Sequence, residues 1–323
     1  MPDKHDPVET LLIAFRERDR ATLEDLARRG VTLEVRGTDG HTVLTRAALR
    51  GDTEAIPWIL QAGAAVDTVD ASGRTARMVA EDAGHGDAVR LLELAGARRP
   101  SAMASIRGLG AFDADDVSVL VRASPGDTAG ALADHIGADR WQRDALGQEV
   151  STAGRCYLVF RFLGHPWTVV RDAHTHPDRH LAAEDAQALS KVLACPALHL
   201  DHRPTQGVLA YRRYDAGQDT EWLDASGSDP AVWPAETGAE DAWDDDCWID
   251  EDLPPPPKGH STREPWDVDA IDDPQRFIDQ RLRDAGAYAP SWGRLRGSVH
   301  RLEIAGLDAA DFERLDFVGA RAW

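Results

Sequence analysis

Cysteine is scarce in this sequence, and the little there is lacks the spacing of a disulfide framework. The three cysteines, Cys156, Cys195 and Cys247, lie far apart among 323 residues. Small scaffolds held by disulfides carry cysteines densely, and structural zinc sites carry them in close pairs. Both classes are therefore excluded, and the three thiols are expected to be reduced and mostly buried.

Long hydrophobic runs are also missing. No apolar stretch approaches the roughly 18 residues that a membrane-spanning helix needs. Met1 is followed by the charged residues Asp3, Lys4 and Asp6 rather than by a basic and then apolar leader. The sequence therefore predicts a cytoplasmic protein that does not cross a membrane.

Positive charge is in deficit. Lys and Arg number 36 against 56 Asp and Glu, which leaves a net charge of −20. Such a field repels phosphate backbones and anionic lipid headgroups, and it speeds encounter with a basic partner. We expect a basic protein as partner and no direct nucleic-acid or membrane binding. Residues 1–100 hold 14 basic and 17 acidic side chains, so most of the excess follows them.

A period of 33 residues runs through the first hundred positions. Gly30, Gly63 and Gly96 are separated by 33 residues each. The same period relates further sets of positions: Ala14, Ala47 and Ala80; Leu26, Ile59 and Leu92; Gly40 and Gly73; Gly51 and Gly84. Small Ala47 and Ala80 would let helices approach closely, and the glycines would end them. A fixed period of this length indicates stacked supersecondary units.

The repeated segments resemble the ankyrin repeat, a β-turn followed by two antiparallel helices. Asp39-Gly40-His41-Thr42 and Ser72-Gly73-Arg74-Thr75 lie where the family has its turn glycine and its helix-starting threonine. The resemblance covers residues 7–99 in about three units, with Pro57 inside a second helix and Arg77 at a usual leucine position as departures. It implies an all-α domain of residues 1–99 that binds proteins through its turn tips and first helices, with candidate contacts His41, Arg46, Arg50, Arg74 and Arg77.

The remaining sequence predicts a linker over residues 100–115 and a mixed α+β domain with an antiparallel sheet over residues 116–323. Apolar, β-rich runs at 156–162 and 166–170 predict a hairpin through Leu163-Gly164-His165. Further strands are predicted at 117–123, 197–200, 207–214, 220–223, 299–304 and 317–318, with helices at 127–136, 182–193 and 277–285. Asp127 is the expected cap of its helix, and residues 139–144 are expected to form a polar turn or a helical piece. We recognise no named family in residues 100–323.

An acidic stretch followed by prolines predicts a long exposed loop at about residues 236–258. Glu236 to Asp252 holds nine carboxylates and no Lys or Arg, and Pro254 to Pro257 follow. Tryptophans anchor interfaces and carboxylates steer basic partners, so one interpretation is a binding loop. Its candidate contacts are Trp243, Asp244, Asp245, Asp246, Trp248, Asp250, Glu251 and Asp252. In the alternatives, both tryptophans pack on their own domain, or the carboxylates hold calcium or magnesium, although EF-hand spacing is absent.

One histidine-rich segment could in principle ligate a transition metal, through His174, His176, Asp178 and His180. Known catalytic signatures place such histidines on a helix or a strand, whereas Pro177 makes this segment a loop. A surface loop explains the composition, so no metal and no cofactor are expected. The sequence also lacks a nucleophile elbow, a phosphate loop and a dinucleotide fingerprint.

Three functions follow from these patterns. The first is a bacterial immunity protein, not an enzyme, that neutralises a toxin through its acidic surface. The second is a metal-dependent hydrolase that uses the loop from His174 to His180. The third is a general ankyrin scaffold or adaptor, in which the second domain only caps the repeats.

Overall fold

The chain folds into two compact units. The computed structural model describes residues 7–71, 73–110, 116–173, 181–203, 206–226, 257–263, 266–289, 299–304 and 307–321. The repeat unit comprises Met1–Ser105, Phe162–Pro166 and Ala310–Glu313. The sheet unit comprises Ile106–Arg161, Trp167–Ala309 and Arg314–Trp323. No helix among the described residues is both long and apolar enough to cross a bilayer.

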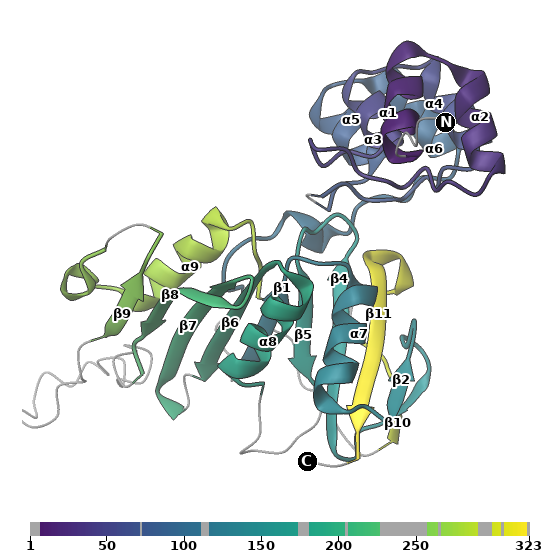
Figure 1. Ribbon diagram of the computed structural model, residues 1–323. Helices are drawn as coiled ribbons and strands as arrows, with labels where there is room; N and C mark the ends of the chain where they lie inside the picture. The colour runs from purple at the N-terminus through teal and green to yellow at the C-terminus, as the bar shows by residue number, and fades with distance from the viewer. Residues whose placement is uncertain are drawn as a thin grey trace, which may run out of the picture. The chain divides into compact units, whose positions relative to one another are not determined.

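Three pairs of helices build the repeat unit, one pair for each 33-residue period (Figure 1). The pairs are α1 (Pro7–Glu17) with α2 (Arg20–Arg28), α3 (Val43–Leu49) with α4 (Ala55–Gln61), and α5 (Ala76–Asp82) with α6 (Gly86–Leu94). The first helices α3 and α5 pack on each other, as do the second helices α4 and α6. A short 3₁₀ helix, Ala102–Ser105, follows the last pair.

The periodic residues do what their spacing predicts. Ala47 and Ala80 are fully buried, and Leu26, Ile59 and Leu92 form part of the same core. Gly51 and Gly84 follow the first helices with φ of +62° and +75°, a left-handed conformation that favours glycine. Pro57 is tolerated because it lies in the first turn of α4, where a backbone N–H would have no acceptor within the helix, so the N–H that proline lacks costs no helical hydrogen bond.

Two segments from later in the chain complete the repeat unit. The backbone N–H of Ser101 donates to the carbonyl of Leu163 at 3.2 Å, and the Ser101 hydroxyl donates to the carboxylate of Asp311 at 2.9 Å. The rings of Phe162 and Phe312 stack with their centroids 5.2 Å apart. The third repeat is therefore followed within this unit by residues from outside the repeats rather than by a fourth repeat.

The sheet unit is built on an antiparallel sheet. Within the described residues, nine strands run in the order β2-β11-β4-β5-β1-β6-β7-β8-β9, and β3 pairs with β10 separately. The strands are β1 (Asp116–Val121), β2 (Arg140–Gln142), β3 (Glu149–Ser151), β4 (Arg155–Phe162), β5 (Thr168–Asp172), β6 (Pro196–Arg203), β7 (Val208–Asp215), β8 (Gln218–Asp224), β9 (Lys258–Ser261), β10 (Val299–Arg301) and β11 (Phe312–Ala320). The helices are α7 (Pro125–Ile136), α8 (Ala183–Leu193) and α9 (Pro274–Asp284).

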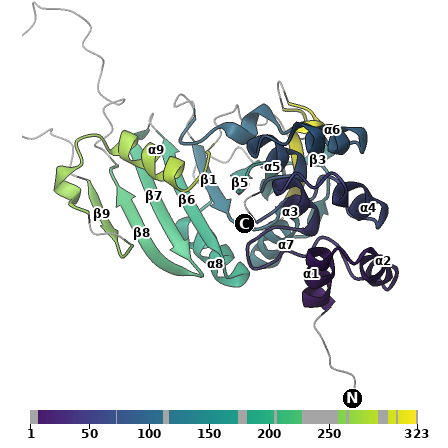
Figure 2. The same cartoon turned by 90° about the horizontal axis from the view of Figure 1, so that it is seen from above.

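Helices lie on both faces of this sheet. Helices α7 and α8 share a core with Val119, Val159 and Val170 on one face. Leu120 and Phe160 point to the other face, along which Figure 2 shows α9, and they are also fully buried. Burial on both faces explains why β1 and β4 are almost continuously apolar instead of alternating.

The predicted elements of this unit are largely confirmed. The hairpin appears as β4 and β5, paired from Tyr157 with Asp172 to Phe160 with Val169. Helix α8, the β6-β7-β8 meander and the mixed α+β class are also as predicted. Strand β11 is longer than the two residues expected, and α9 begins three residues earlier than predicted, at Pro274.

Two local predictions were wrong, and two strands were not predicted. Ser124, not Asp127, caps α7, because its hydroxyl accepts the backbone N–H of Asp127 at 3.1 Å and Pro125 opens the helix. Part of segment 139–144 is strand β2, which hydrogen-bonds to β11 rather than forming a turn or helix. Strands β3 and β9 were not predicted, since their residues become strands only through pairing with β10 and β8.

Acid should destabilise the fold partly through His199. This side chain is buried and donates from Nε2 to the carbonyl of Leu181 at 3.0 Å. Burial lowers the pKa of His199 below its ordinary 6.5, so the unfolded chain binds more protons as pH falls below that value. Stability from this group is therefore complete above about pH 6.5 and lost below it.

The variant His199→Gln keeps a donor for Leu181 but does not titrate. Urea unfolding measured from about pH 7 to about pH 5 should therefore show a smaller loss of stability in the variant than in the wild type. Equal losses in both proteins would contradict the assignment.

Candidate functional site

The turns that precede the first helices are fixed by local caps. Thr42 begins α3, and its hydroxyl accepts the backbone N–H of Thr45 at 3.1 Å, while the Thr45 hydroxyl accepts the backbone N–H of Thr42 at 2.8 Å. Thr75 begins α5 and accepts the backbone N–H of Met78 at 3.3 Å. Each cap satisfies N–H groups that the first turn of a helix leaves without partners. The turns of the second and third repeats thus project from well-defined helix starts.

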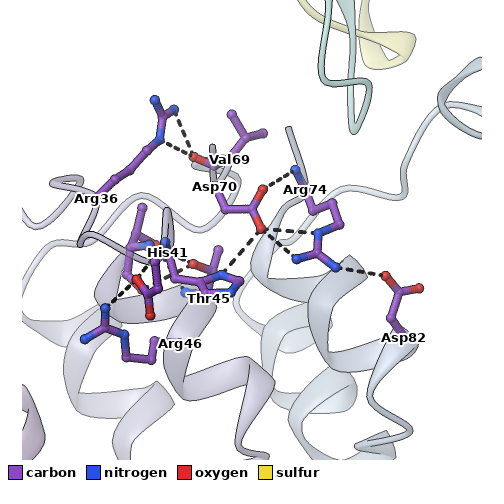
Figure 3. A network of polar contacts seen from close by, with 10 residues as sticks. Arg36, His41, Thr45, Arg46, Val69, Asp70, Arg74 and Asp82 are labelled. Carbon is purple, nitrogen blue, oxygen red and sulfur yellow. Dashed lines mark hydrogen bonds and ion pairs between the residues drawn. The ribbon is translucent and has the colours of Figure 1, made fainter. Parts of the chain in front are cut away.

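A buried carboxylate joins two successive turns (Figure 3). Asp70 accepts the backbone N–H of Arg74 at 2.9 Å and its guanidinium at 3.1 and 3.2 Å. The Nδ1 atom of His41, from the preceding turn, lies 3.4 Å from the same carboxylate. Arg36 donates twice to the carbonyl of Val69, at 3.0 and 3.1 Å. These contacts connect the two turns to each other.

Most of the predicted contact residues on this surface are engaged within the repeats. His41 has a side chain that is 14% exposed, and Arg74 contacts Asp70 and also lies 3.6 Å from Asp82. Arg46 donates to Asp39 at 2.6 Å. Burial alone would raise the pKa of Asp39, but its hydrogen bonds with Arg46 and His41 and their charges lower it.

Arg77 has an internal role in this structure. Its side chain is 7% exposed and lies 2.7 Å from Glu81 and 2.9 Å from Glu93. The guanidinium thereby links α5 to α6, the two helices of the third repeat. An arginine at a usual leucine position is accommodated because two carboxylates compensate its charge.

Arg50 differs from the other four. It is exposed at the end of α3, and it has no ion pair or side-chain hydrogen bond with any residue that the structure describes. Its guanidinium lies over the ring of Phe15, 6.0 Å from the centroid, which is a cation–π geometry. Leu49 beside it is 43% exposed.

Arg50 lines a pocket of about 500 Å³. The first two repeats line it, through Phe15, Arg16, Arg18, Arg50, Gly51, Asp52, Thr53 and Glu54. Arg18 donates to Asp52 and to Glu54, each at 2.9 Å, and so connects the turn after α1 to the turn before α4. Its φ is +58°, a conformation that a non-glycine residue adopts only at an energetic cost. Both carboxylates that line the pocket are therefore engaged by Arg18.

Comparison with known proteins identifies the repeats. The family model for ankyrin repeats, in three copies, matches residues 11–98. These residues are ankyrin repeats. No family model matches the remainder of the chain.

One relative is similar over part of the chain. Potassium channel AKT3 of Oryza sativa subsp. japonica is 38% identical over 78 residues, which are 23% of this chain. The same residues cover 8% of the channel, so the likeness extends to a small part of that protein.

Ankyrin repeats bind proteins, and the repeat unit is a protein-binding module of this general kind.

The other predicted site residues lie outside the described part of the chain. This holds for the acidic stretch, with Trp243, Asp244, Asp245, Asp246, Trp248, Asp250, Glu251 and Asp252, and for the possible metal ligands His174, His176, Asp178 and His180. The described residues contain no group of three or more His, Cys, Asp or Glu arranged to hold a metal ion.

The two described cysteines have the properties expected from their sequence context. Cys156 is buried, Cys195 is half-buried, and both are free thiols. Burial raises the pKa of Cys156 to about 12, and it also raises the pKa of Cys195. Both thiols therefore stay protonated near neutral pH, whereas a reactive cysteine depends on its thiolate.

Sequence reasoning missed the residues that assemble the pocket. Phe15, Arg18 and Asp52 come from two repeats and were not among the predicted contacts. A partial signal was available, because Arg18-Asp19 and Gly51-Asp52 lie one period apart at the ends of the first helices. That pattern did not show that Arg18 pairs with carboxylates whereas Arg50 lies over an aromatic ring.

Proposed function

We propose that this chain is a non-enzymatic protein that binds another protein through the first helices of its ankyrin repeats, and that it neutralises the partner by doing so. The observation that carries the proposal is the array of three repeats, which presents Arg50 beside a pocket as an exposed cation without an ion pair among the described residues. The remaining predicted arginines of the array are held by carboxylates and stiffen the surface instead.

We infer further that the partner is a basic toxin and that the chain is its immunity protein. Charge supports this inference, because residues after 100 carry 39 acidic and 22 basic side chains. The stretch from Glu236 to Asp252 concentrates nine of the carboxylates beside Trp243 and Trp248. Carboxylates speed the approach of a cationic enzyme, and tryptophans supply binding energy once water is excluded.

Affinity capture tests the proposal. Tagged full-length protein is incubated with lysate of its source organism at low and at moderate salt, and the retained proteins are identified by mass spectrometry. We expect one basic protein in stoichiometric amount, retained less well as salt rises. A partner that is acidic, or retention that ignores salt, would contradict the toxin inference. No retained protein at either salt would contradict protein binding itself.

Association kinetics with the captured partner test the acidic stretch. Replacing Asp244, Asp245 and Asp246 together by asparagine should slow association about tenfold at low salt and flatten its salt dependence. The matched control replaces Asp87, Asp272 and Glu303 by their amides, which changes net charge equally at exposed positions of the described chain. Equal slowing in both triple variants would mean that overall charge, and not this stretch, steers the encounter.

A further inference from the structure

The pocket beside Arg50 has the charged residues of an anion-binding site, because its lining holds one more cation than carboxylates. Three arginines and two carboxylates line it, and Arg18 engages both carboxylates at 2.9 Å. The carboxylate of Asp52 also accepts the backbone N–H of Ala55 at 3.0 Å, where α4 begins. Asp52 is thereby held in place by Arg18 and by the start of α4, and no hydrogen bond or ion pair joins it to Arg50 among the described residues.

The guanidinium of Arg50 is oriented before any ligand arrives. It lies over Phe15, which is itself buried and 6.4 Å from the ring of Trp58, centroid to centroid. A guanidinium that lies over an aromatic face keeps the N–H groups at its edge free to donate. Two parallel N–H donors match the two oxygens of a carboxylate, and a preoriented fork loses less entropy on binding.

Arg16 adds a second cation to the lining of the same pocket. Among the described residues it forms an ion pair with Glu17, its neighbour in sequence, at 3.8 Å, and both side chains are more than half exposed. An exposed pair of this kind contributes little and is easily exchanged for another partner. A ligand carboxylate between Arg16 and Arg50 would meet two donors, with Leu49 as an exposed apolar neighbour.

Resting on the proposed protein-binding function, we propose that this pocket recognises a carboxylate of the bound protein, carried on an acidic segment of its chain. The volume of about 500 Å³ admits side chains rather than a folded element. The net charge of −20 repels an acidic ligand at long range, so binding of such a ligand must come from local contacts. The partner then presents a carboxylate to the repeat unit in addition to any basic surface that faces the acidic stretch.

A defined peptide tests the pocket without the natural partner. The probe is a fluorescein-labelled hexaglutamate peptide, and its anisotropy is followed as full-length protein is added. We expect saturable binding that Arg50→Ala weakens about tenfold or more, the effect of losing a charge-assisted hydrogen-bond pair. Arg50→Lys, which keeps the charge but not the fork, should retain only part of the affinity.

The matched control is Arg90→Ala. Arg90 is an exposed arginine of α6 that does not line the pocket, and its removal changes net charge by the same amount. Equal weakening by Arg50→Ala and Arg90→Ala, or equal binding of a hexaglutamine peptide, would overturn the proposal. So would an absence of saturable hexaglutamate binding to the wild type.

Competition with two small anions shows whether the pocket prefers a carboxylate or a phosphate. Acetate should displace the peptide at least as well as inorganic phosphate at equal ionic strength, and much stronger displacement by phosphate would overturn the carboxylate assignment. The outcome is independent of lysate capture. A captured partner whose affinity is unchanged by Arg50→Ala would leave protein binding itself standing but would remove Arg50 and the pocket from it. Saturable peptide binding without a captured partner would leave the pocket standing and contradict the proposed function.

Discussion

Replacement of Asp316 by alanine should lower the free energy of unfolding of the sheet unit by about 3 kcal/mol or more. Asp316 lies on β11 and is fully buried. Its carboxylate accepts the indole N–H of Trp141 at 2.9 Å, the guanidinium of Arg314 at 2.8 Å and the backbone N–H of Asp144 at 3.2 Å. Alanine would leave three donors without their acceptor, and two of them belong to β2 or to the turn that follows it.

The matched control is Asp139→Ala. Asp139 also contacts arginines, Arg140 at 3.3 Å and Arg321 at 3.0 Å, but its side chain is 40% exposed. Exposed pairs contribute about 0–1 kcal/mol, so this variant should unfold almost as the wild type does. Urea unfolding gives both values, and hydrogen exchange of the peptides around β2 locates the loss. If Asp316→Ala lost no more unfolding free energy than Asp139→Ala, the buried carboxylate would not be what holds β2 and its turn against β11.

Replacement of Gly73 by alanine should destabilise the repeat unit by about 1–3 kcal/mol more than the same change at Gly84. Gly73 lies in the turn before α5 with φ of +78°, and a Cβ atom there would lie 2.7 Å from Cα of Pro166 and closer still to the carbonyl oxygen of His165. These are backbone atoms, so relief requires movement of the segment Phe162–Pro166. That segment is one of the two that complete the repeat unit.

Gly84 makes the comparison specific. Its φ is +75°, so alanine meets the same left-handed strain there, but no atom lies within 4 Å of the added Cβ. The difference between Gly73→Ala and Gly84→Ala therefore isolates the contact with His165 and Pro166. It is measured by urea unfolding, and hydrogen exchange of residues 162–166 should rise in Gly73→Ala alone. Equal destabilisation by both variants would indicate that the turn conformation, and not this contact, sets the cost.

The stability of each binding variant decides how its binding result is interpreted. Arg50 is exposed and its side chain forms no hydrogen bond or ion pair with the described residues, so Arg50→Ala should leave the unfolding transition nearly unchanged. Arg77→Ala would be a poor probe of binding, because it removes a buried side chain that links α5 to α6 and so would itself lower stability. A binding defect at Arg50 with normal stability can then be assigned to the pocket.

Local interactions are what the sequence by itself determined. The 33-residue period, the threonines that begin α3 and α5, and the glycines that end the first helices act within a few residues of each other, so their pattern predicted the repeats. Long amphipathic or apolar segments such as α8 and the β4-β5 hairpin were also predicted, because their periodicity reports burial directly.

Long-range pairing was decided only by the tertiary structure. Residues 140–142 and 258–261 carry no strong strand pattern, and they become β2 and β9 because β11 and β8 offer them hydrogen bonds. The arginines show the same limit on the first helices. Arg46, Arg50 and Arg77 look equivalent in the sequence, yet carboxylates reach two of them and an aromatic ring reaches the third. Charge pairing depends on distances of a few ångströms between segments far apart in the chain, and only folding sets those distances.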